Sequence, residues 1–559
     1  MVAAAHPLAV EAGLDILKQG GSAVDAAVAV QAVLGLVEPE SSGLGGGAFM
    51  LYWDAEAAKL EAYDGRETAP ASVTPTLFLD DKGQPLEFYS AAKTGRAVGV
   101  PGVVSLLTLA REDHGKLPWA KLLQPAIRLA EHGFEVTPGL HDVIASTPAL
   151  DENAPARALY FDADGQPLAA GTLLKNPAYA VTLKDLAAKG PRAFYEGPIA
   201  QGIVATVTGA PRRPGGMTLA DLANYTAKRR APLCAPYHDE KICTMPPPSG
   251  GVTLLEIMKL LEPTDLASLH PASAEAVHLF SEASALSYVD RDRYVGDPDH
   301  VAVPVQGLLD AGYLDARRKL IDRTHHAGAF SAGTPPGAQV RADTPQPEVP
   351  STSHFVIVDK KGNIVSMTTT VEADFGSNLM TGGFILNNQL TDFSFLPTDK
   401  GKPVANAVAP GKRPRSAMSP AIVFDGAGKP ILAIGSPGGA RIISYVAQSL
   451  VNRLDWKLPL QEAVARPHHI DMNKGLELEQ GSELERLKPA LEAMGHTVTV
   501  RPLHSGLHGI ALTPNGLEGA ADPRREGAAL GLGSQSTSTA PGPDLINKRF
   551  ELIKRQEAR

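Results

Sequence analysis

The first forty residues carry two hydrophobic patterns that predict consecutive helices. In residues 7–20 apolar side chains recur at helical spacing, with a proline in the first turn and two glycines at the end. Residues 22–38 repeat the pattern. Ser22 is placed to cap this helix, Asp25 three residues later approximates a capping box, and Glu38-Pro39 ends it.

The pattern changes sharply near the middle of the chain. Residues 325–351 contain five prolines and almost no large apolar side chains, which is typical of a linker or a functional segment. Directly after Thr352, residues 355–358 form an apolar run that predicts a buried strand. A turn at 359–362 and a second strand at 364–371 follow. A polar segment that ends at the first residue of a core strand is the layout expected if the chain is cut there.

Two further strands are expected in the last third of the chain. Residues 384–389 predict one, closely followed by Asp392, and residues 431–434 predict the other. The glycine-rich turn 435–439 comes next, and a helix begins near Ala440. Backbone N–H groups in such a turn stabilise anions, and no GK[ST] sequence follows that would make it a phosphate-binding loop. We therefore interpret the turn as an oxyanion hole.

Helices and short strands alternate through the remaining sequence, which predicts an α/β (α+β) fold without a repeat at a fixed period. Residues 536–559 lose the apolar pattern, and we expect them to form a loose C-terminal tail.

Composition excludes several classes of protein. Of 559 residues, 20% are charged, and the formal net charge is −9. Such a chain, without basic tracts, has no electrostatic footprint for nucleic acid. The longest nearly apolar run, residues 26–37, is about a dozen residues long and therefore too short to span a bilayer. No signal peptide is visible, so either the protein is cytoplasmic or the sequence is a mature form.

Cysteine and histidine spacing predicts no metal site and no cofactor. Cys234 and Cys243 flank a stretch that can fold back as a hairpin, so they form either a disulfide or two separate buried side chains. No CxxC pair occurs, and His468-His469 lack a third ligand at zinc spacing.

Thr352 is a candidate nucleophile. A threonine hydroxyl needs a base within reach, and cleavage before Thr352 creates an α-amine with a pKa near 7.7–8.0 on the same residue. On the strand 364–371, side chains alternate between two faces, and Thr370 and Glu372 share one of them with Ser366 and Thr368. Thr370 and Glu372 are therefore expected in one site beside Thr352.

Short motifs spread in order from about residue 3 to about residue 533 extend this picture. They are Gly43–Gly47, Asp64–Pro70, Met245–Gly251, Thr352–Phe355, Asn387–Phe393, Lys412–Pro420 and Gly435–Arg441. On these motifs the chain resembles the γ-glutamyltranspeptidases, a family of the N-terminal-nucleophile hydrolase group.

The resemblance implies a four-layer αββα sandwich made as an inactive precursor. Autocatalytic cleavage between Ser351 and Thr352 would give a large subunit, residues 1–351, and a small subunit, residues 352–559. Residues from about 325 to 351 would then be a flexible polar tail of the large subunit.

The resemblance also implies an activity without a cofactor. The enzyme would transfer the γ-glutamyl group of glutathione or glutamine-like amides, through an acyl-enzyme, to water or to an amino acid or peptide amine. The implied roles are Thr352 as nucleophile, Thr370 as its orienting partner, Gly438 and Gly439 as oxyanion donors, Arg66 and Ser416 (with Ala417 adjacent) for the substrate α-carboxylate, and Glu372, Gln389 and Asp392 for its α-ammonium. These charges suit a zwitterion, since a planar guanidinium matches a carboxylate and carboxylates match an ammonium. His354 is interpreted as structural support.

Three departures from the family pattern bear on substrate choice. Many relatives have Asn where this chain has Glu372, and many have Ser-Ser where it has Ser416-Ala417. The connection from Phe393 to Asn406 is short compared with relatives that fold a longer lid over the site. A more open pocket that admits bulkier acceptors or acyl groups is the resulting hypothesis.

Three alternatives stay open at this point. A cephalosporin (glutaryl-type) acylase resembles the same family, but its substrate lacks the ammonium that Glu372 and Asp392 suit. A poly-γ-glutamate depolymerase or capsule ligase uses the same nucleophile, and a non-catalytic scaffold protein would stay uncut. Many bacterial family members are exported, so the resemblance implies a periplasmic or secreted protein, with a cytoplasmic one as the alternative.

Overall fold

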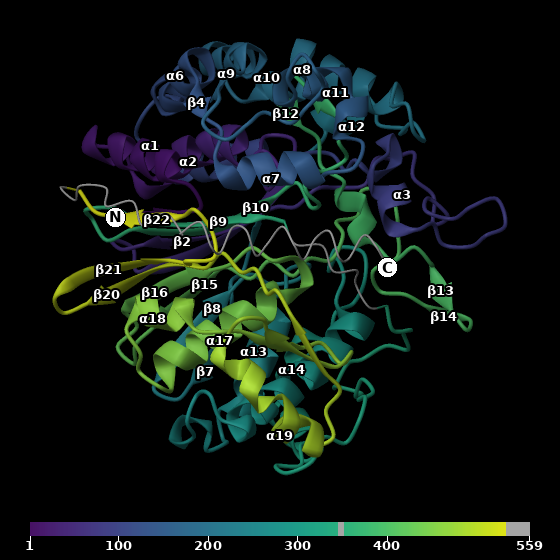
Figure 1. Cartoon of the computed structure of the whole chain (residues 1–559), viewed down its shortest axis with the longest axis vertical. Coiled ribbons are helices and arrows are strands. Elements are labelled where there is room, and N and C mark those ends of the chain that lie inside the picture. Colours follow the sequence, from purple (N-terminus) through teal and green to yellow (C-terminus); the bar gives the residue numbers. More distant parts are fainter. Residues whose placement is uncertain (345–350, 533–559) are drawn as a thin grey trace.

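Two antiparallel sheets packed face to face form the centre of the protein (Figure 1). The computed structural model describes residues 1–344 and 351–532. In spatial order the first sheet contains β22 (Ala528–Leu530), β1 (Val2–Ala4), β9 (Ser353–Val358), β10 (Ile364–Thr370), β2 (Gly47–Asp54), β3 (Lys59–Gly65) and β6 (Lys228–Arg230). The second contains β21 (Gly516–Ala521), β20 (His508–Thr513), β16 (Pro430–Gly435), β15 (Ala421–Phe424), β8 (Glu240–Thr244) and β7 (Leu233–Tyr237).

Alternation along the central strands divides the apolar side chains between two cores. In β9, Phe355 and Ile357 join the core on the helix side of the first sheet, whereas Val356 and Val358 join the core between the sheets. On β10, Ser366 faces the second sheet and donates to the carbonyl of Ile434 in β16 at 3.4 Å. The predicted strand pair and its two faces are therefore confirmed.

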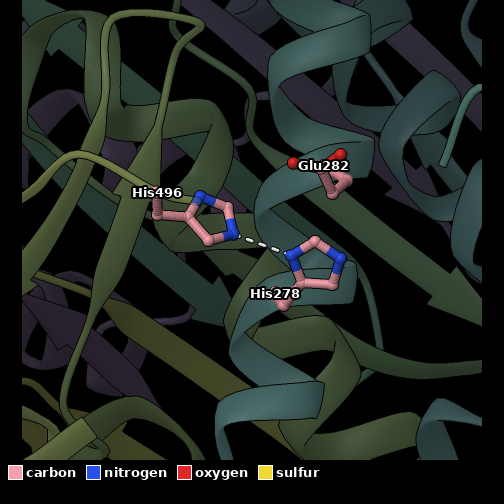
Figure 2. A group of neighbouring side chains, drawn as sticks. All are labelled: His278, Glu282 and His496. Atoms are coloured by element: carbon pink, nitrogen blue, oxygen red, sulfur yellow. Dashed lines mark hydrogen bonds between the residues drawn. The ribbon is translucent and has the colours of Figure 1, made fainter. Parts of the chain in front are cut away.

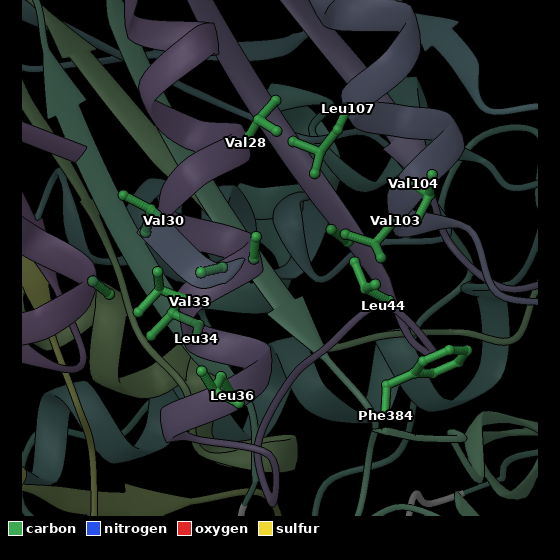
Figure 3. Close-up of a cluster of buried hydrophobic side chains, with 14 of the residues drawn as sticks. Val28, Val30, Val33, Leu34, Leu36, Leu44, Val103, Val104, Leu107 and Phe384 are labelled. Atoms are coloured by element: carbon green, nitrogen blue, oxygen red, sulfur yellow. The ribbon is translucent and has the colours of Figure 1, made fainter. Parts of the chain in front are cut away.

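The first two predicted helices form the layer above the first sheet (Figure 1). They are α1 (Pro7–Lys18) and α2 (Ala23–Val37), and α2 begins with the predicted capping box of Ser22 and Asp25. Every side chain of α2 is buried, because the helix lies between the sheet and a second set of helices. Figure 3 shows Val28 of α2 beside Leu107 of α4 (Val103–His114).

The remaining helices complete the layers. Outside α2 lie α6 (Gln124–His132), α7 (Pro138–Ser146), α8 (Ala154–Tyr160), α9 (Pro177–Lys189), α10 (Arg192–Tyr195), α11 (Gly197–Thr208) and α12 (Leu219–Ala223). Below the second sheet lie α13 (Gly251–Leu261), α14 (Ala274–Tyr294), α16 (Ala311–Arg318), α17 (Ile442–Leu454), α18 (Leu460–Ala465) and α19 (Lys488–Ala493). The result is the predicted four-layer αββα sandwich.

Shorter elements lie at the edges of the sandwich. A three-stranded sheet contains β17 (His469–Asp471), β18 (Leu476–Glu479) and β19 (Val498–Arg501), and a hairpin contains β13 (Thr398–Asp399) and β14 (Lys402–Pro403). No helix among the described residues is long and apolar enough to cross a membrane.

One predicted strand is wrong in extent. Residues 384–389 contain only the two-residue β12 (Phe384–Ile385), and Gln389–Asp392 form a 3₁₀ turn. The cause is Asn387, whose side-chain oxygen accepts from the N–H groups of Gly99 and Gln389, both at 2.9 Å. These side-chain bonds replace a strand ladder.

The open question about the cysteines has an answer in the sheet register. Cys234 on β7 lies directly opposite Cys243 on β8, and the two are joined as a disulfide. The described part of the predicted polar tail, residues 325–344, contains no helix or strand longer than an isolated bridge. Residues 345–350 and the predicted C-terminal tail, 536–559, lie outside the described residues.

Candidate active site

Thr352 directly precedes β9 and lies beside the C-terminal end of β10. In the register of the two strands Ser353 pairs with Thr369, so Thr352 and Thr370 are the next neighbours. The Thr352 hydroxyl donates to Oγ1 of Thr370 at 3.0 Å, and the same oxygen accepts the backbone N–H of Glu372 at 2.9 Å. The nucleophile predicted from sequence is thus held by a hydroxyl that is itself fixed by the backbone.

Hydrogen bonds to Ser351 hold the peptide bond before Thr352 in place. The N–H of Gly438 donates to the carbonyl oxygen of Ser351 at 3.3 Å, and the Ser351 hydroxyl donates to the Glu40 carbonyl at 2.9 Å. Thr352 has a φ of 104°, which is a strained conformation for a β-branched residue. The glycine turn therefore polarises the carbonyl that the Thr352 hydroxyl would attack.

Gly438 occupies its position because of its backbone conformation. Its φ is 134°, and a Cβ atom there would lie 2.6 Å from Cε2 of Tyr445 in α17. The next residue, Gly439, has a φ of 59° and lines the cavity. Both predicted oxyanion donors therefore lie where β16 turns into the N-terminal end of α17.

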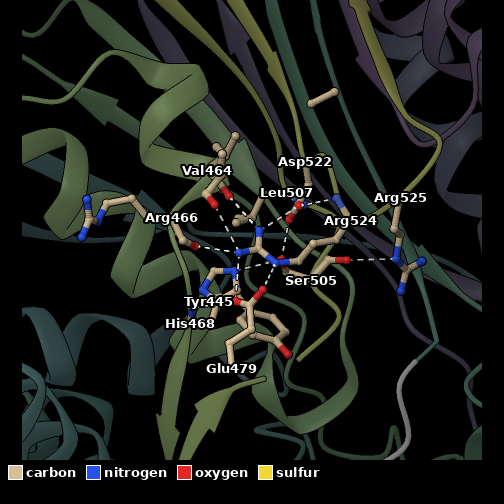
Figure 4. Close-up of polar contacts among 12 residues, drawn as sticks. Tyr445, Val464, Arg466, His468, Glu479, Ser505, Leu507, Asp522, Arg524 and Arg525 are labelled. Atoms are coloured by element: carbon tan, nitrogen blue, oxygen red, sulfur yellow. Dashed lines mark hydrogen bonds and ion pairs between the residues drawn. The ribbon is translucent and has the colours of Figure 1, made fainter. Parts of the chain in front are cut away.

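Two half-buried arginines, Arg524 and Arg525, lie near Thr352. Figure 4 shows Arg525 beside Ser505, and Arg524 between Glu479 and Asp522. Arg525 donates to the Thr352 carbonyl at 3.2 Å and to the Ser505 carbonyl at 3.0 Å. Its neighbour Arg524 forms ion pairs with Glu479 and Asp522. The sequence analysis did not identify Arg525, because a single arginine in a polar run carries no periodic or motif signal.

Arg66 is a buried cation at the end of β3. Its side chain is 1% exposed, and it donates to the carbonyls of Pro414 at 3.1 Å and Arg415 at 2.9 Å. Nη2 also donates to the Asp392 carboxylate at 2.5 Å. Nη1 has no hydrogen bond among the described residues, only an ion pair with Glu67 at 3.7 Å. Nη1 of Arg66 is therefore the part of the guanidinium that could bind a substrate carboxylate.

Glu372 and Asp392 place two carboxylates in the same region. Burial, reinforced by the negative charge of Asp392, raises the pKa of Glu372 well above its usual range. Asn388 donates to Glu372, and Gln389 donates to Asp392 at 2.6 Å. Because Arg66 already pairs with Asp392, the site favours a further cation beside Glu372.

Ser416 and Ala417 line the same cavity as Arg66 and Thr352. The Ser416 N–H donates to the Pro248 carbonyl at 2.8 Å, and its hydroxyl oxygen accepts from the N–H of Met418 at 3.1 Å. The hydroxyl hydrogen remains available as a donor. Ala417 presents only a methyl group.

One cavity brings most of the predicted residues together. Its lining is Arg66, Thr352, Thr370, Glu372, Gln389, Asp392, Ser416, Ala417, Met418, Gly439, Ala440 and Ile442. Ser351 and Gly438 lie behind Thr352, joined by the hydrogen bond already described. No residue from 394 to 406, the short connection, is among the lining residues.

His354 and His468, which the sequence analysis considered, are buried and hydrogen-bonded to neighbouring side chains. His354 is buried with Nδ1 2.9 Å from the Thr368 hydroxyl, and burial lowers its pKa well below the usual range. His468 is likewise buried and neutral, with its ring nitrogens near Gln448 at 3.0 Å and Ser505 at 2.8 Å. Neither geometry is that of a base acting on Thr352.

An αββα sandwich with a threonine opening a central strand beside an oxyanion turn defines the class of the N-terminal-nucleophile hydrolases. The family model for gamma-glutamyltranspeptidase matches residues 9–532. The chain belongs to this family, so the membership and fold expected from the motifs are confirmed.

Relatives of known name agree with this assignment. The chain is 39% identical over 546 residues to a glutathione hydrolase proenzyme of Bacillus subtilis (strain 168), a match that covers 95% of this chain and 91% of that protein. It is 36% identical over 543 residues to the acylase ACY 1 proenzyme of Pseudomonas sp. (strain V22), with 95% and 93% covered. The crystal structure of a cephalosporin acylase from Bacillus halodurans superposes with a TM-score of 0.83 at 30% identity, covering 94% of each chain.

Proposed function

We propose that the protein is a glutathione hydrolase and γ-glutamyltransferase that activates itself by cutting between Ser351 and Thr352. The observation that carries this proposal is the bond from the Gly438 N–H to the Ser351 carbonyl, beside the Thr352 hydroxyl. Several relatives are named proenzymes, which supports processing. The large subunit would be residues 1–351 and the small subunit residues 352–559.

Self-cleavage begins when the Thr352 hydroxyl oxygen attacks the Ser351 carbonyl carbon. The Gly438 N–H holds the developing oxyanion. The C–N bond breaks, the hydroxyl proton passes to the departing nitrogen, and Ser351 is left as an ester on Thr352. One water molecule hydrolyses the ester, giving a free Ser351 carboxylate and a free Thr352 amine and hydroxyl.

In turnover the new amine is the base. It takes the proton of the Thr352 hydroxyl as the oxygen attacks the γ-carbonyl of the donor. The N–H groups of Gly438 and Gly439 would hold the oxyanion, and the proton leaves with the amine product. Water or an acceptor amine then attacks the γ-glutamyl ester and regenerates Thr352.

Substrate choice follows from the charges of the cavity. Nη1 of Arg66 and the Ser416 hydroxyl would bind the α-carboxylate, and Glu372, Gln389 and Asp392 would bind the α-ammonium. Asp392 is already paired with Arg66, so the ammonium would chiefly supply the positive charge that Glu372 lacks. A donor without the ammonium leaves Glu372 without this charge, at a cost of about 1–3 kcal/mol.

The second candidate is a glutaryl-type acylase, favoured by the named acylase relatives. Glutaryl compounds carry the terminal carboxylate but no ammonium. A direct comparison of γ-glutamyl anilide with glutaryl anilide separates the two functions. We expect the γ-glutamyl compound to have the higher kcat/KM by about 10- to 100-fold, and a preference for the glutaryl compound would reverse the ranking.

Processing has its own test. Mass spectrometry and N-terminal sequencing of the purified protein should find a fragment that begins Thr-Ser-His-Phe. An active protein that is one continuous chain would contradict the proposal.

We also propose a more open acceptor side and export from the cytoplasm. The short connection does not contribute to the cavity lining, so acceptors bulkier than single amino acids should be used; strict preference for the smallest would argue against this. The disulfide between Cys234 and Cys243 suits an oxidising compartment. Cell fractionation of the native host tests the location.

A further inference from the structure

A group of histidines and one glutamate lies in the lower helical layer, apart from the cavity. His278 and Glu282 are one turn apart on α14, and His496 precedes β19 (Figure 2). Nδ1 of His278 is 2.7 Å from Nε2 of His496. One potential ligand atom from each of the three side chains lies within 4.8 Å of the others.

Neighbouring groups fix the orientation of these side chains. Nε2 of His278 lies 2.6 Å from the Asp322 carbonyl, which can only accept, so this nitrogen carries the hydrogen and Nδ1 has the lone pair. Nδ1 of His326 lies 2.6 Å from Oε1 of Glu282. These contacts are the outer partners that metal-binding histidines and carboxylates have in proteins.

The group is buried and incompletely satisfied. Oε2 of Glu282 and Nδ1 of His496 have no hydrogen-bond partner among the described residues. The contact between Nδ1 of His278 and Nε2 of His496 needs one donor and one acceptor, so Nε2 of His496 carries the hydrogen. A cation would compensate a carboxylate that is costly to bury alone.

We propose that His278, Glu282 and His496 bind a divalent transition-metal ion, with zinc as the best match to two imidazoles and one carboxylate. The ligand atoms would be Nδ1 of His278, Nε2 of His496 and Oε2 of Glu282, and water would complete a tetrahedron. The two ring nitrogens are now 2.7 Å apart. To form zinc–nitrogen bonds of about 2.0–2.1 Å in a tetrahedron, they need to move apart by less than about 1 Å. Binding requires a lone pair on Nε2 of His496, so its hydrogen moves from Nε2 to Nδ1.

A second group with similar composition provides a contrast. Glu61, Asp113 and His114 also lie within ligand distance of one another. However, Lys59 pairs with Glu61 at 2.6 Å, and Arg229 pairs with Asp113 at 2.6 Å. Because cations already neutralise both carboxylates, this group serves as the control.

The proposed ion would also connect the two subunits. His278 and Glu282 precede the cleavage site and His496 follows it, so this part rests on the proposed function. After cleavage the ion would join α14 of the large subunit to the β19 region of the small one. Such a bond stabilises only the associated form.

The test is metal stoichiometry of the purified full-length or processed protein. After equilibration with zinc and removal of unbound ion by gel filtration, elemental analysis should find one equivalent in the wild type and in His114→Gln. Glu282→Gln and His496→Gln should each lose it. His326→Gln should keep the site but weaken its affinity about 10- to 100-fold.

Cobalt provides a measurement that does not depend on any variant. Wild-type protein with cobalt should show the intense visible absorption bands of a tetrahedral site, which zinc then removes. Absence of stoichiometric zinc and of these bands in folded wild type overturns the proposal, and so does retention of zinc in both Glu282→Gln and His496→Gln. A denaturing gel and anilide turnover on the same samples report cleavage and activity separately, so the failure of one proposal is distinguishable from the failure of the other.

Discussion

The cavity has two halves that are built differently. The reaction half lies where β9 begins and where β10 and β16 end. The recognition half lies on loops and on the 3₁₀ turn Gln389–Asp392. The reaction half contains Thr352, Thr370, Gly438 and Gly439, and the recognition half contains Arg66, Glu372, Gln389, Asp392 and Ser416.

The residues of the reaction half are held in place by strand pairing. Those of the recognition half are held by contacts between side chains. Thr352 reaches Thr370 because the strand register makes them neighbours, and no charge is involved. Asp392 instead meets Arg66 across 326 residues of sequence. The halves should therefore respond differently to substitution: the reaction half in kcat, and the recognition half in KM, charge selectivity and stability.

The largest expected effect is from Thr352→Ala. Without the hydroxyl, neither the Ser351 carbonyl nor a donor can be attacked, so the chain should stay full-length and activity should fall on the order of 10⁴-fold or more. A gel and a γ-glutamyl anilide assay measure both. Ser353→Ala is the control, because its hydroxyl bonds Glu38 instead. A Thr352→Ala protein that still matures and turns over would refute the nucleophile assignment.

Gly438→Ala should have the next largest effect. Its φ of 134° and the contact with Tyr445 would displace the turn and its N–H. Removal of one oxyanion donor typically lowers the rate about 10²–10³-fold, so we expect that loss in kcat and slow maturation. Gly428→Ala has a comparable positive φ of 79° with open space around the new methyl. Equal rate losses in the two variants would mean that strain alone, not the donor, matters.

Asp392→Asn tests the recognition half. It removes the charge that we propose binds the ammonium, so kcat/KM for γ-glutamyl anilide should fall about 10- to 100-fold, mainly through KM. Turnover of glutaryl anilide should change much less. Asp399→Asn, on the exposed hairpin strand β13, is the matched control. A parallel loss for both anilides would show that Asp392 acts only by holding Arg66.

Glu372→Gln should have the smallest effect on activity and the opposite effect on stability. Its pKa is raised in the folded protein, so its contribution to stability is lost as pH rises above the unfolded value of about 4.3. The neutral amide should raise the apparent Tm near neutral pH, by about 1 °C for each kcal/mol recovered in a chain of this length.

Thermal unfolding scans of wild type and Glu372→Gln across the acid-to-neutral range measure this difference. The two curves should converge at low pH, where Glu372 is protonated in both the folded and unfolded states. A gap that widens toward low pH would have the wrong sign. The variant should also bind γ-glutamyl donors a few-fold more weakly, on the order of 1 kcal/mol.

The same contrast explains what could be predicted from the sequence. Period-two alternation places Thr370 and Glu372 together, and a strand followed by glycines locates Gly438, so local rules were sufficient for the reaction half. Residues 384–389 were predicted as one strand because they begin with the apolar run Phe384–Leu386, but the bonds of Asn387 to distant backbone redirect the chain. Tertiary bonds of this kind carry no periodic signal.

Long-range pairings were likewise out of reach. The family resemblance implied that Arg66 binds the substrate carboxylate and Asp392 its ammonium. Nothing in the spacing of the two residues indicates that they contact each other. Arg525 and the group around His496 lie far in sequence from the residues they meet.

If the proposed self-cleavage is right, the contact between the Gly438 N–H and the Ser351 carbonyl makes maturation depend on correct folding of the glycine turn. A precursor with a misplaced turn would then not release the Thr352 amine, and it would stay inactive. The fraction of cleaved chains in a preparation would then measure the fraction of molecules in which the glycine turn is correctly placed.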